Sequence, residues 1–226
     1  MKFAAVTTFP AKAYQTDGKR FIESFFEWWP IGVDLHVFHE DMRPDDADPR
    51  VQWHPLLSDK DWVAFTGRHH DEGPDQNLHA VKYSHKVFAL TGVKTDADWL
   101  ISIDSDLETA RMITPQFLRS ICPDDAVAAY LARPWLYTDT CFTAYRLDPV
   151  GREFLAGLRA FYTSDAVTKL PVRRDAAAFD ALREQYEKDG HRFFNLARGA
   201  SGIDVLPQSR VGNFIRRRAG KQSKAA

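Results

Sequence analysis

Apolar residues follow two spacings along the chain, one typical of buried strands and the other of helices that cover a sheet. Runs of strand length occur at residues 2–8, 33–41 and 97–103. The last run, Ala-Asp-Trp-Leu-Ile-Ser-Ile, is almost continuously hydrophobic. Such a strand is typical of the middle of a parallel sheet with helices on both faces.

Helical spacing fills the intervals between these runs. The first predicted helix is capped by Thr16 or Asp17 and stopped by Pro30, and its apolar face consists of Phe21, Ile22, Phe25, Phe26 and Trp29. Further helices are predicted over 77–92, after Thr114-Pro115, after Asp148-Pro149 and over 175–188. Both Pro dipeptides place a capping side chain before a proline at the first helical position, which favours helix initiation there.

The order of these elements predicts an α/β fold with a single open, mostly parallel but mixed sheet flanked by helices. Two later strands are expected at 127–133 and 140–147, and residues 42–73 are expected to be loops with one short strand or helix near 61–66. Neither a repeat nor a clean linker interrupts the pattern. We therefore expect one domain over residues 1–215, followed by a basic C-terminal tail over 216–226.

Composition narrows the class of protein. The 226 residues are 44% hydrophobic and 13% aromatic, which excludes a disordered chain, and the net charge of −1 gives no overall attraction to nucleic acid or membranes. Cys122 and Cys141 fit no zinc or redox spacing, so we expect buried reduced thiols. Because no apolar stretch approaches membrane-spanning length, a cytoplasmic protein is expected.

The strongest chemical signal is Asp104-Ser105-Asp106, directly after the most hydrophobic strand. That strand brings Asp104 to the carboxyl edge of the sheet, where open α/β folds bind ligands. In an extended chain Asp104 and Asp106 would project to the same side, and paired carboxylates suit Mg²⁺ or Mn²⁺. The alternative interpretation is that Asp104 caps a loop and Asp106 is solvated.

At these residues the chain resembles the GT-A glycosyltransferases, and in particular short glycosyltransferase-like proteins often encoded by bacteriophages. The segments that carry the resemblance are 3–10, 82–89, 99–106, 141–147, 174–180 and 205–212. The resemblance implies a GT-A fold, a nucleotide-sugar donor, and Mn²⁺ or Mg²⁺ held by Asp104 and Asp106 against the donor diphosphate. A phage-encoded protein of this kind would act in the host cytoplasm.

One departure from the GT-A pattern lies near the C-terminus. Many of these enzymes take a third metal ligand from a His followed by Gly and Lys, whereas this chain has Arg216, Arg217 and Arg218 before Gly220-Lys221. Either water completes the metal site or the tail contacts phosphate directly, since the arginine fork matches phosphate oxygens. Arg217 is the residue we expect to contact the donor phosphates.

Four further residues are predicted to bind the nucleotide sugar. Thr7 and Thr8 end the first strand at the same edge as Asp104, and in resembling enzymes that loop holds the nucleoside. Lys82 and Lys86 lie one helical turn apart and could offset the charge of the diphosphate. The alternatives are a strand end without a ligand and a solvated helix face.

Carboxylates at the start of the last helix are the candidate general bases. The resemblance implies that an inverting enzyme would use Asp175 to remove a proton from the acceptor hydroxyl, with Asp180 as the reserve candidate. Asp175 is equally well explained as the N-cap of its helix. His85, on the apolar face of its helix, is interpreted as a core histidine, and His69-His70-Asp71 is not expected to bind metal.

The leading hypothesis is therefore a metal-dependent hexosyl- or pentosyltransferase, inverting or retaining, that uses a hydroxyl acceptor. A hydroxylated base in phage DNA is one candidate acceptor, and the basic tail would then follow the DNA backbone with Arg216, Arg217, Arg218, Lys221 and Lys224. A glycan, protein or small molecule is the alternative. Two rivals stay open. One is a nucleotidyltransferase acting on a sugar phosphate, although residues 7–12 lack the expected glycine-rich loop, and the other is a binding module without turnover.

Overall fold

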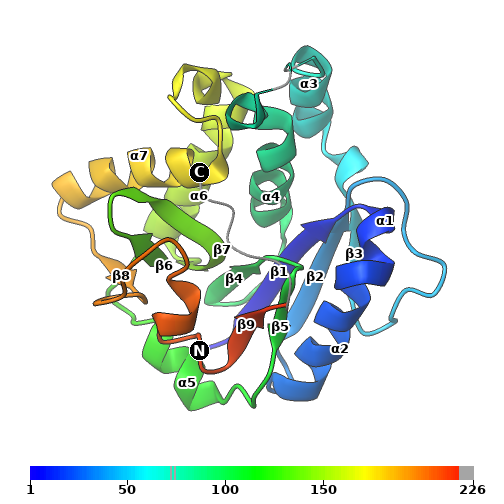
Figure 1. Cartoon of the computed structure of the whole chain (residues 1–226), viewed down its shortest axis with the longest axis vertical. Helices are drawn as coiled ribbons and strands as arrows, with labels where there is room; N and C mark the ends of the chain where they lie inside the picture. The colour runs from blue at the N-terminus through cyan, green and yellow to red at the C-terminus, as the bar shows by residue number, and fades with distance from the viewer. Residues whose placement is uncertain (72, 74, 219–226) are drawn as a thin grey trace.

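The computed structural model describes residues 1–71, 73 and 75–218 and is built around a seven-stranded sheet (Figure 1). Its strands are β1 (Phe3–Phe9), β2 (Asp34–His39), β3 (Gln52–Pro55), β4 (Trp99–Ile103), β6 (Ala128–Arg133), β7 (Leu136–Arg146) and β8 (Phe193–Asn195). Their order is β3-β2-β1-β4-β7-β6-β8, and β7 alone runs against its neighbours in this sheet. This arrangement confirms the predicted open, mixed α/β sheet.

Helices cover both faces of the sheet. They are α1 (Ala11–Ala13), α2 (Lys19–Trp28), α3 (Lys60–Arg68), α4 (Ala80–Gly92), α5 (Pro115–Ile121), α6 (Pro149–Thr163) and α7 (Asp175–Lys188). Helices α2 and α5 pack with one hydrophobic cluster, which includes Phe25, Leu118 and Ile101. Helices α3, α4, α6 and α7 pack with a second cluster on the other face. None of the described helices is long and apolar enough to cross a membrane.

A small two-stranded ribbon beside the main sheet pairs a segment from the middle of the chain with one near its C-terminus. Strand β5 (Leu107–Thr109) pairs antiparallel with β9 (Ile215–Arg217), so that Leu107 lies opposite Arg217. Figure 1 shows this ribbon in front of β1 and β4. Residues 215–217, which span the expected start of the tail, therefore lie in a strand, whereas Gly220, Lys221 and Lys224 lie outside the described residues.

Several local predictions are confirmed and others are corrected. Thr114 and Asp148 cap α5 and α6 as expected, by accepting from Phe117 N and Gly151 N. The expected cap at Thr16 or Asp17 is wrong, because a π-helical turn over Tyr14–Gly18 runs directly into α2. Strand β7 begins at Leu136, four positions earlier than predicted, since it forms a tight hairpin with β6.

Candidate functional site

A cleft of about 420 Å³ opens at the carboxyl edge of the parallel strands. It is bounded by the ends of β1 and β4, by α4 and the start of α7, and by the first part of β7 together with β9. The predicted site residues that line it are Thr7, Thr8, Lys82, Lys86, Asp104, Asp106, Asp175 and Arg217. Thus the fold brings together all the predicted residues except Asp180.

Asp104 and Asp106 reach this cleft through a turn and not through an extended chain. Strand β4 ends at Ile103, and the backbone of Leu107 donates back to the carbonyl of Asp104 at 3.1 Å. The expectation that alternation along an extended chain aligns the two carboxylates is therefore wrong. Their common exposure to the cleft comes from the tight turn between β4 and β5.

Lys86 lies at the centre of the charged groups on the cleft floor. Its Nζ is 2.5 Å from Asp104 Oδ1 and 3.4 Å from Asp175 Oδ2, and it donates to the carbonyl of Thr140 at 2.9 Å. Burial opposes the lysine charge, but the two carboxylates outweigh that effect and raise the pKa of Lys86. Lys86 therefore stays cationic and ties the end of β4 to the start of α7.

The pKa of the Asp104 carboxyl is higher than that of an ordinary aspartate. Burial at the base of the cleft raises its pKa to about 6; the ammonium of Lys86 acts against this rise, and the charge of Asp106 adds to it. The group is ionised at neutral pH, yet it sits close to its titration point. The ammonium of Lys86 supplies one positive charge between Asp104 and Asp175. A second cation beside Asp106 would therefore still be attracted by the carboxylates of the cleft.

The residues present fit a divalent cation of the Mg²⁺ or Mn²⁺ type. Oδ1 of Asp106 is buried and has no hydrogen-bond partner among the described residues. Such an oxygen is costly to bury unless a ligand or ion satisfies it. Asp104 and Asp106 supply two hard oxygen donors, and no cluster of three or more His, Cys, Asp or Glu was found in the described part of the chain. Mg²⁺ sites of this sort are completed by water and phosphate oxygens.

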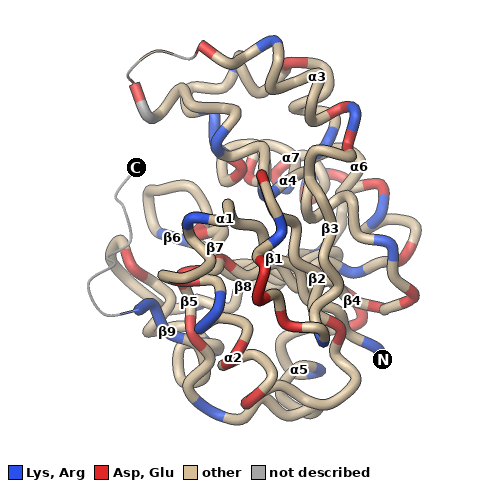
Figure 2. Tube along the Cα trace, turned by 90° about the vertical axis from the view of Figure 1, so that its right-hand side faces the viewer, with Lys and Arg blue, Asp and Glu red and all other residues tan. Residues whose placement is uncertain are grey.

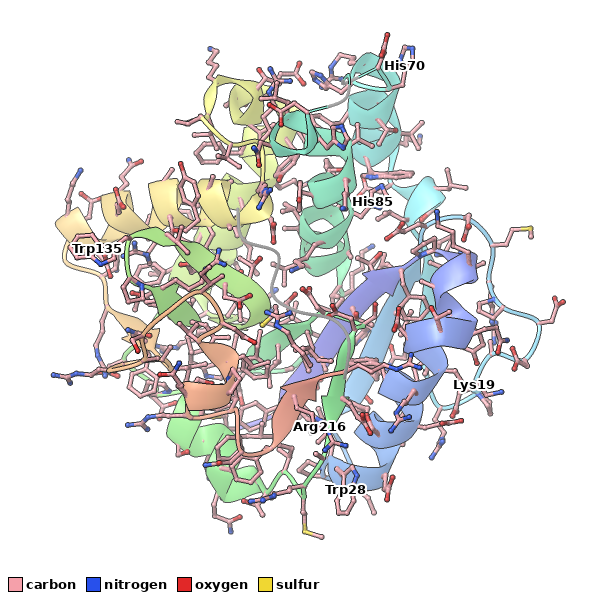
Figure 3. The ribbon with its side chains drawn as sticks, viewed as in Figure 1. Lys19, Trp28, His70, His85, Trp135 and Arg216 are labelled. Carbon is pink, nitrogen blue, oxygen red and sulfur yellow. The ribbon has the colours of Figure 1, made fainter. Side chains whose placement is uncertain are left out.

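The ends of β1 and β2 form another wall of the cleft. Thr7 carries a buried hydroxyl without a hydrogen-bond partner in the described residues, whereas the hydroxyl of Thr8 donates to the carbonyl of Phe38 at 2.9 Å. Glu40 Oε2 lies 2.8 Å from His85 Nδ1, and both side chains face the cleft. His85 is therefore not the core histidine predicted from its helical position; Figure 3 labels it on α4.

Arg217 fixes the opposite wall. It lies 2.7 Å from Asp139 Oδ2, and only 12% of its side chain is exposed. Burial would raise the pKa of Asp139, but Arg217 and the hydrogen bonds from Cys141 lower it, so the pair is ionised. Both cysteines are free and buried, as predicted.

The two carboxylates of α7 have different surroundings. Asp175 is the first residue of the helix and lines the cleft, and the N-cap is Arg174, so the predicted N-cap interpretation of Asp175 is wrong. Asp180 lies outside the cleft lining, where its oxygens accept from the backbone and the hydroxyl of Thr138 at 2.7 and 2.6 Å. Its contacts make Asp180 an anchor for β7.

Comparison of the structure with solved ones identifies the architecture. Mouse xyloside xylosyltransferase 1, in its apo form, superposes with a TM-score of 0.53 at 11% identity over 87% of this chain and 85% of that one. The fold is a GT-A-like glycosyltransferase fold. A glycosyltransferase involved in glycosylation of the major capsid of PBCV-1 gives a TM-score of 0.48 at 10% identity, covering 99% and 95% of the two chains. No protein-family model and no curated protein sequence matches the chain.

Sequence reasoning missed several residues of this GT-A-like cleft. Arg133, Tyr137 and Thr140 come from the β6–β7 hairpin, whose antiparallel return the hydrophobic pattern did not reveal. Arg174 lines the cleft while donating to Asn77 Oδ1 at 2.7 Å and lying over the ring of Tyr83. The adjacent pair Arg173-Arg174 before a helix was a usable signal, because cations so placed are available to an anionic ligand.

Proposed function

We propose that this protein is a metal-dependent glycosyltransferase that moves a sugar from a nucleotide-sugar donor to a hydroxyl acceptor. The observation that carries the proposal is Oδ1 of Asp106, which is buried beside Asp104 with no hydrogen-bond partner in the described part of the chain, in a cleft that also contains cationic side chains. Those cations are Lys82, Lys86, Arg133, Arg174 and Arg217. A diphosphate would suit both the carboxylate pair and the cationic side chains, since its oxygens ligate a divalent ion and accept hydrogen bonds from Lys and Arg.

Each wall of the cleft has a distinct task in this proposal. Asp104 and Asp106 would hold Mn²⁺ or Mg²⁺, which when bound supplies a Lewis acid for the leaving diphosphate. Thr7 and Thr8 would bind the nucleoside, and Arg174 and Arg217 would bind phosphate oxygens. Lys86 keeps Asp104 and Asp175 in place through its ion pairs.

The acceptor side is assigned to α7. If the reaction inverts the anomeric carbon, Asp175 would accept the proton of the attacking hydroxyl, because it lines the cleft at the start of α7. Asp180 is not carried into this role, since Thr138 occupies its oxygens. A retaining reaction would need no such base. The hydroxylated DNA base stays a prediction, because most of the basic tail lies outside the described residues.

Ligand-induced stabilisation tests the ion site directly. Nucleoside diphosphates and sugar nucleotides are screened by thermal melting with and without Mn²⁺. One class should raise the Tm by several degrees in the presence of Mn²⁺, because a ligand at 100 times its Kd adds about 2.7 kcal/mol. Asp106→Asn should remove the metal-dependent part, whereas the exposed control Asp45→Asn should keep it.

The products separate this function from its rivals. A transferase releases free sugar and nucleoside diphosphate slowly in water, a nucleotidyltransferase releases pyrophosphate from a nucleoside triphosphate, and a binding module does neither. Full metal-dependent stabilisation of Asp106→Asn would refute the proposed ion site. Pyrophosphate release without sugar release would replace the transferase by the nucleotidyltransferase.

A further inference from the structure

The tip of the β6–β7 hairpin presents a tryptophan entirely to solvent. Trp135 is 100% exposed, whereas the other large exposed hydrophobic side chains of the described chain are aliphatic or methionine. Figure 3 shows it at the edge of the molecule, beside the hairpin and α7. Full exposure of an indole is unfavourable, since roughly 25 cal/mol is lost for each Å² of apolar surface left in water.

The backbone at this position is also strained. Arg133 pairs with Leu136, so that Pro134 and Trp135 alone form the hairpin loop, and Trp135 has φ +66°. A positive φ after proline is the pattern of a type II turn, which favours Gly or Asn at this position. Trp135 therefore places a bulky aromatic side chain at a turn position that favours a small residue. Strain of this kind is a common mark of a functional position.

The hairpin joins Trp135 to the cleft. Arg133, on one arm, and Tyr137, on the other, both line the cleft that contains Asp104 and Asp175. Arg133 is itself held by the hairpin, because its Nε donates to the carbonyl of Tyr137 at 2.6 Å. A ligand that extends out of the cleft past these two residues would therefore reach the indole ring.

The charges of helix α7, which lies beside the hairpin, favour a neutral ligand over a polyanion. Helix α7, which packs against β7, carries four acidic and two basic side chains. Arg183 of this helix is already paired with Asp180 and Glu187. Figure 2 shows the opposite side of the molecule, where Lys and Arg are interspersed with Asp and Glu. A nucleic acid backbone would need a continuous stripe of basic side chains along its path.

We propose that Trp135 is a stacking platform for a sugar ring of a neutral glycan acceptor, whose reacting end lies in the cleft. This inference rests on the proposed function and specifies its acceptor class. A pyranose ring has a face of C–H groups that packs against the electron-rich face of an indole, while its hydroxyls stay hydrated at the edge. An exposed indole suits this contact because it has only two side-chain torsions, so little side-chain freedom is lost on binding.

Glycan binding by the full chain, without nucleotide, tests the platform. The probes are the hexasaccharides of xylose, cellulose, maltose and chitin, measured by titration calorimetry up to about 10 mM. At least one should bind, and Trp135→Ala should weaken it roughly tenfold or more. Trp135→Phe should retain most of the affinity, and the exposed control Met112→Ala, outside the cleft lining, should retain all of it.

A further variant separates binding from folding. Trp135→Gly relieves the positive φ and removes the ring, so it should melt within roughly 2 °C of the wild type while binding as weakly as Trp135→Ala. The platform is overturned if no hexasaccharide binds, or if the affinity is the same in Trp135→Ala. It is also overturned if only a single-stranded oligonucleotide binds in a Trp135-dependent way, which would indicate a nucleic acid acceptor.

The two proposals fail separately in these measurements. Loss of glycan binding with intact Mn²⁺-dependent donor stabilisation would refute the platform and leave the transferase standing. Glycan binding that depends on Trp135, without any donor stabilisation or sugar release, would refute the transferase and leave a glycan-binding module.

Discussion

Lys86 shows how one cationic side chain can hold two carboxylates together at the base of a cleft. Its ammonium contacts Asp104 and Asp175, which belong to a strand end and a helix start far apart in the sequence. Without it, two carboxylates would face each other beside Asp106. Only 23% of the Lys86 side chain is exposed, so water screens these contacts less than it does at the surface.

Replacing this lysine should therefore destabilise the whole protein. Lys86→Met should lower the free energy of unfolding by about 3 kcal/mol at pH 7, because the remaining carboxylates lose their counter-ion in a partly buried setting. Urea denaturation measures the change. Lys94→Met, at an exposed position, serves as the matched control and should change stability by less than about 0.5 kcal/mol. Equal losses in the two variants would contradict the proposed role of Lys86.

At the scale of single residues, the sequence predicted the site residues that lie at or near the ends of strands. Thr7 lies near the end of β1 and Asp104 directly follows β4, and both line the cleft at the expected edge of the sheet. His85 was misjudged because its helical position suggests the core, and its partner Glu40 comes from the end of β2. Such a partner depends on tertiary packing, which a helical pattern does not contain.

Among the elements, α6 depends on an unusually close approach to the end of β7. A Cβ added to Gly151 would lie 1.8 Å from the carbonyl oxygen of Arg146, a backbone atom that cannot rotate away. The Gly151 amide also donates to the capping carboxylate of Asp148 at 2.8 Å. The first turn of α6 can therefore pack this closely against the end of β7 only because residue 151 has no side chain.

A pair of identical substitutions within α6 tests this constraint. Gly151→Ala should destabilise the fold by at least about 3 kcal/mol, because the strand end or the helix must move. Gly157→Ala meets only the flexible end of Leu182 at 2.9 Å and gains helix propensity, so its effect should stay within about 1 kcal/mol. Denaturant titration of both variants gives the comparison. A mild effect at residue 151 would show that β7 and α6 adjust independently.

The sequence predicted most elements but not how distant ones pair. Caps at Thr114 and Asp148 were recognisable because their chemistry is local. The pairing of β5 with β9 joins segments about one hundred residues apart, and both strands are only three residues long. Short strands carry too few alternating positions to be distinguished from loops, which is why Arg217 was assigned to a tail.

Over the whole molecule, two hydrophobic layers are separated by the sheet, and few ionisable groups lie within them. His36, in the middle of β2, is one exception, with 1% of its surface exposed. Its Nδ1 lies 3.0 Å from Nε2 of His54, and its Nε2 is buried with no hydrogen-bond partner among the described residues. Burial lowers the pKa of His36 to about 4; the nearby His54 contributes to this, and Asp34 opposes it weakly.

This histidine should therefore limit the stability of the protein in acid. Between pH 6.5 and 4 the unfolded chain binds a proton at residue 36 that the folded chain does not, so stability falls as the pH falls through this window. The loss from this residue should reach about 2 kcal/mol between pH 7 and pH 5 and level off below pH 4. His36→Asn should show a correspondingly smaller loss in urea titrations at the two pH values. His70→Asn, at an exposed position near the top of Figure 3, should follow the wild type. If His36→Asn lost as much stability as the wild type, the acid sensitivity would have to come from other groups, and His36 would have to be solvated in the folded protein.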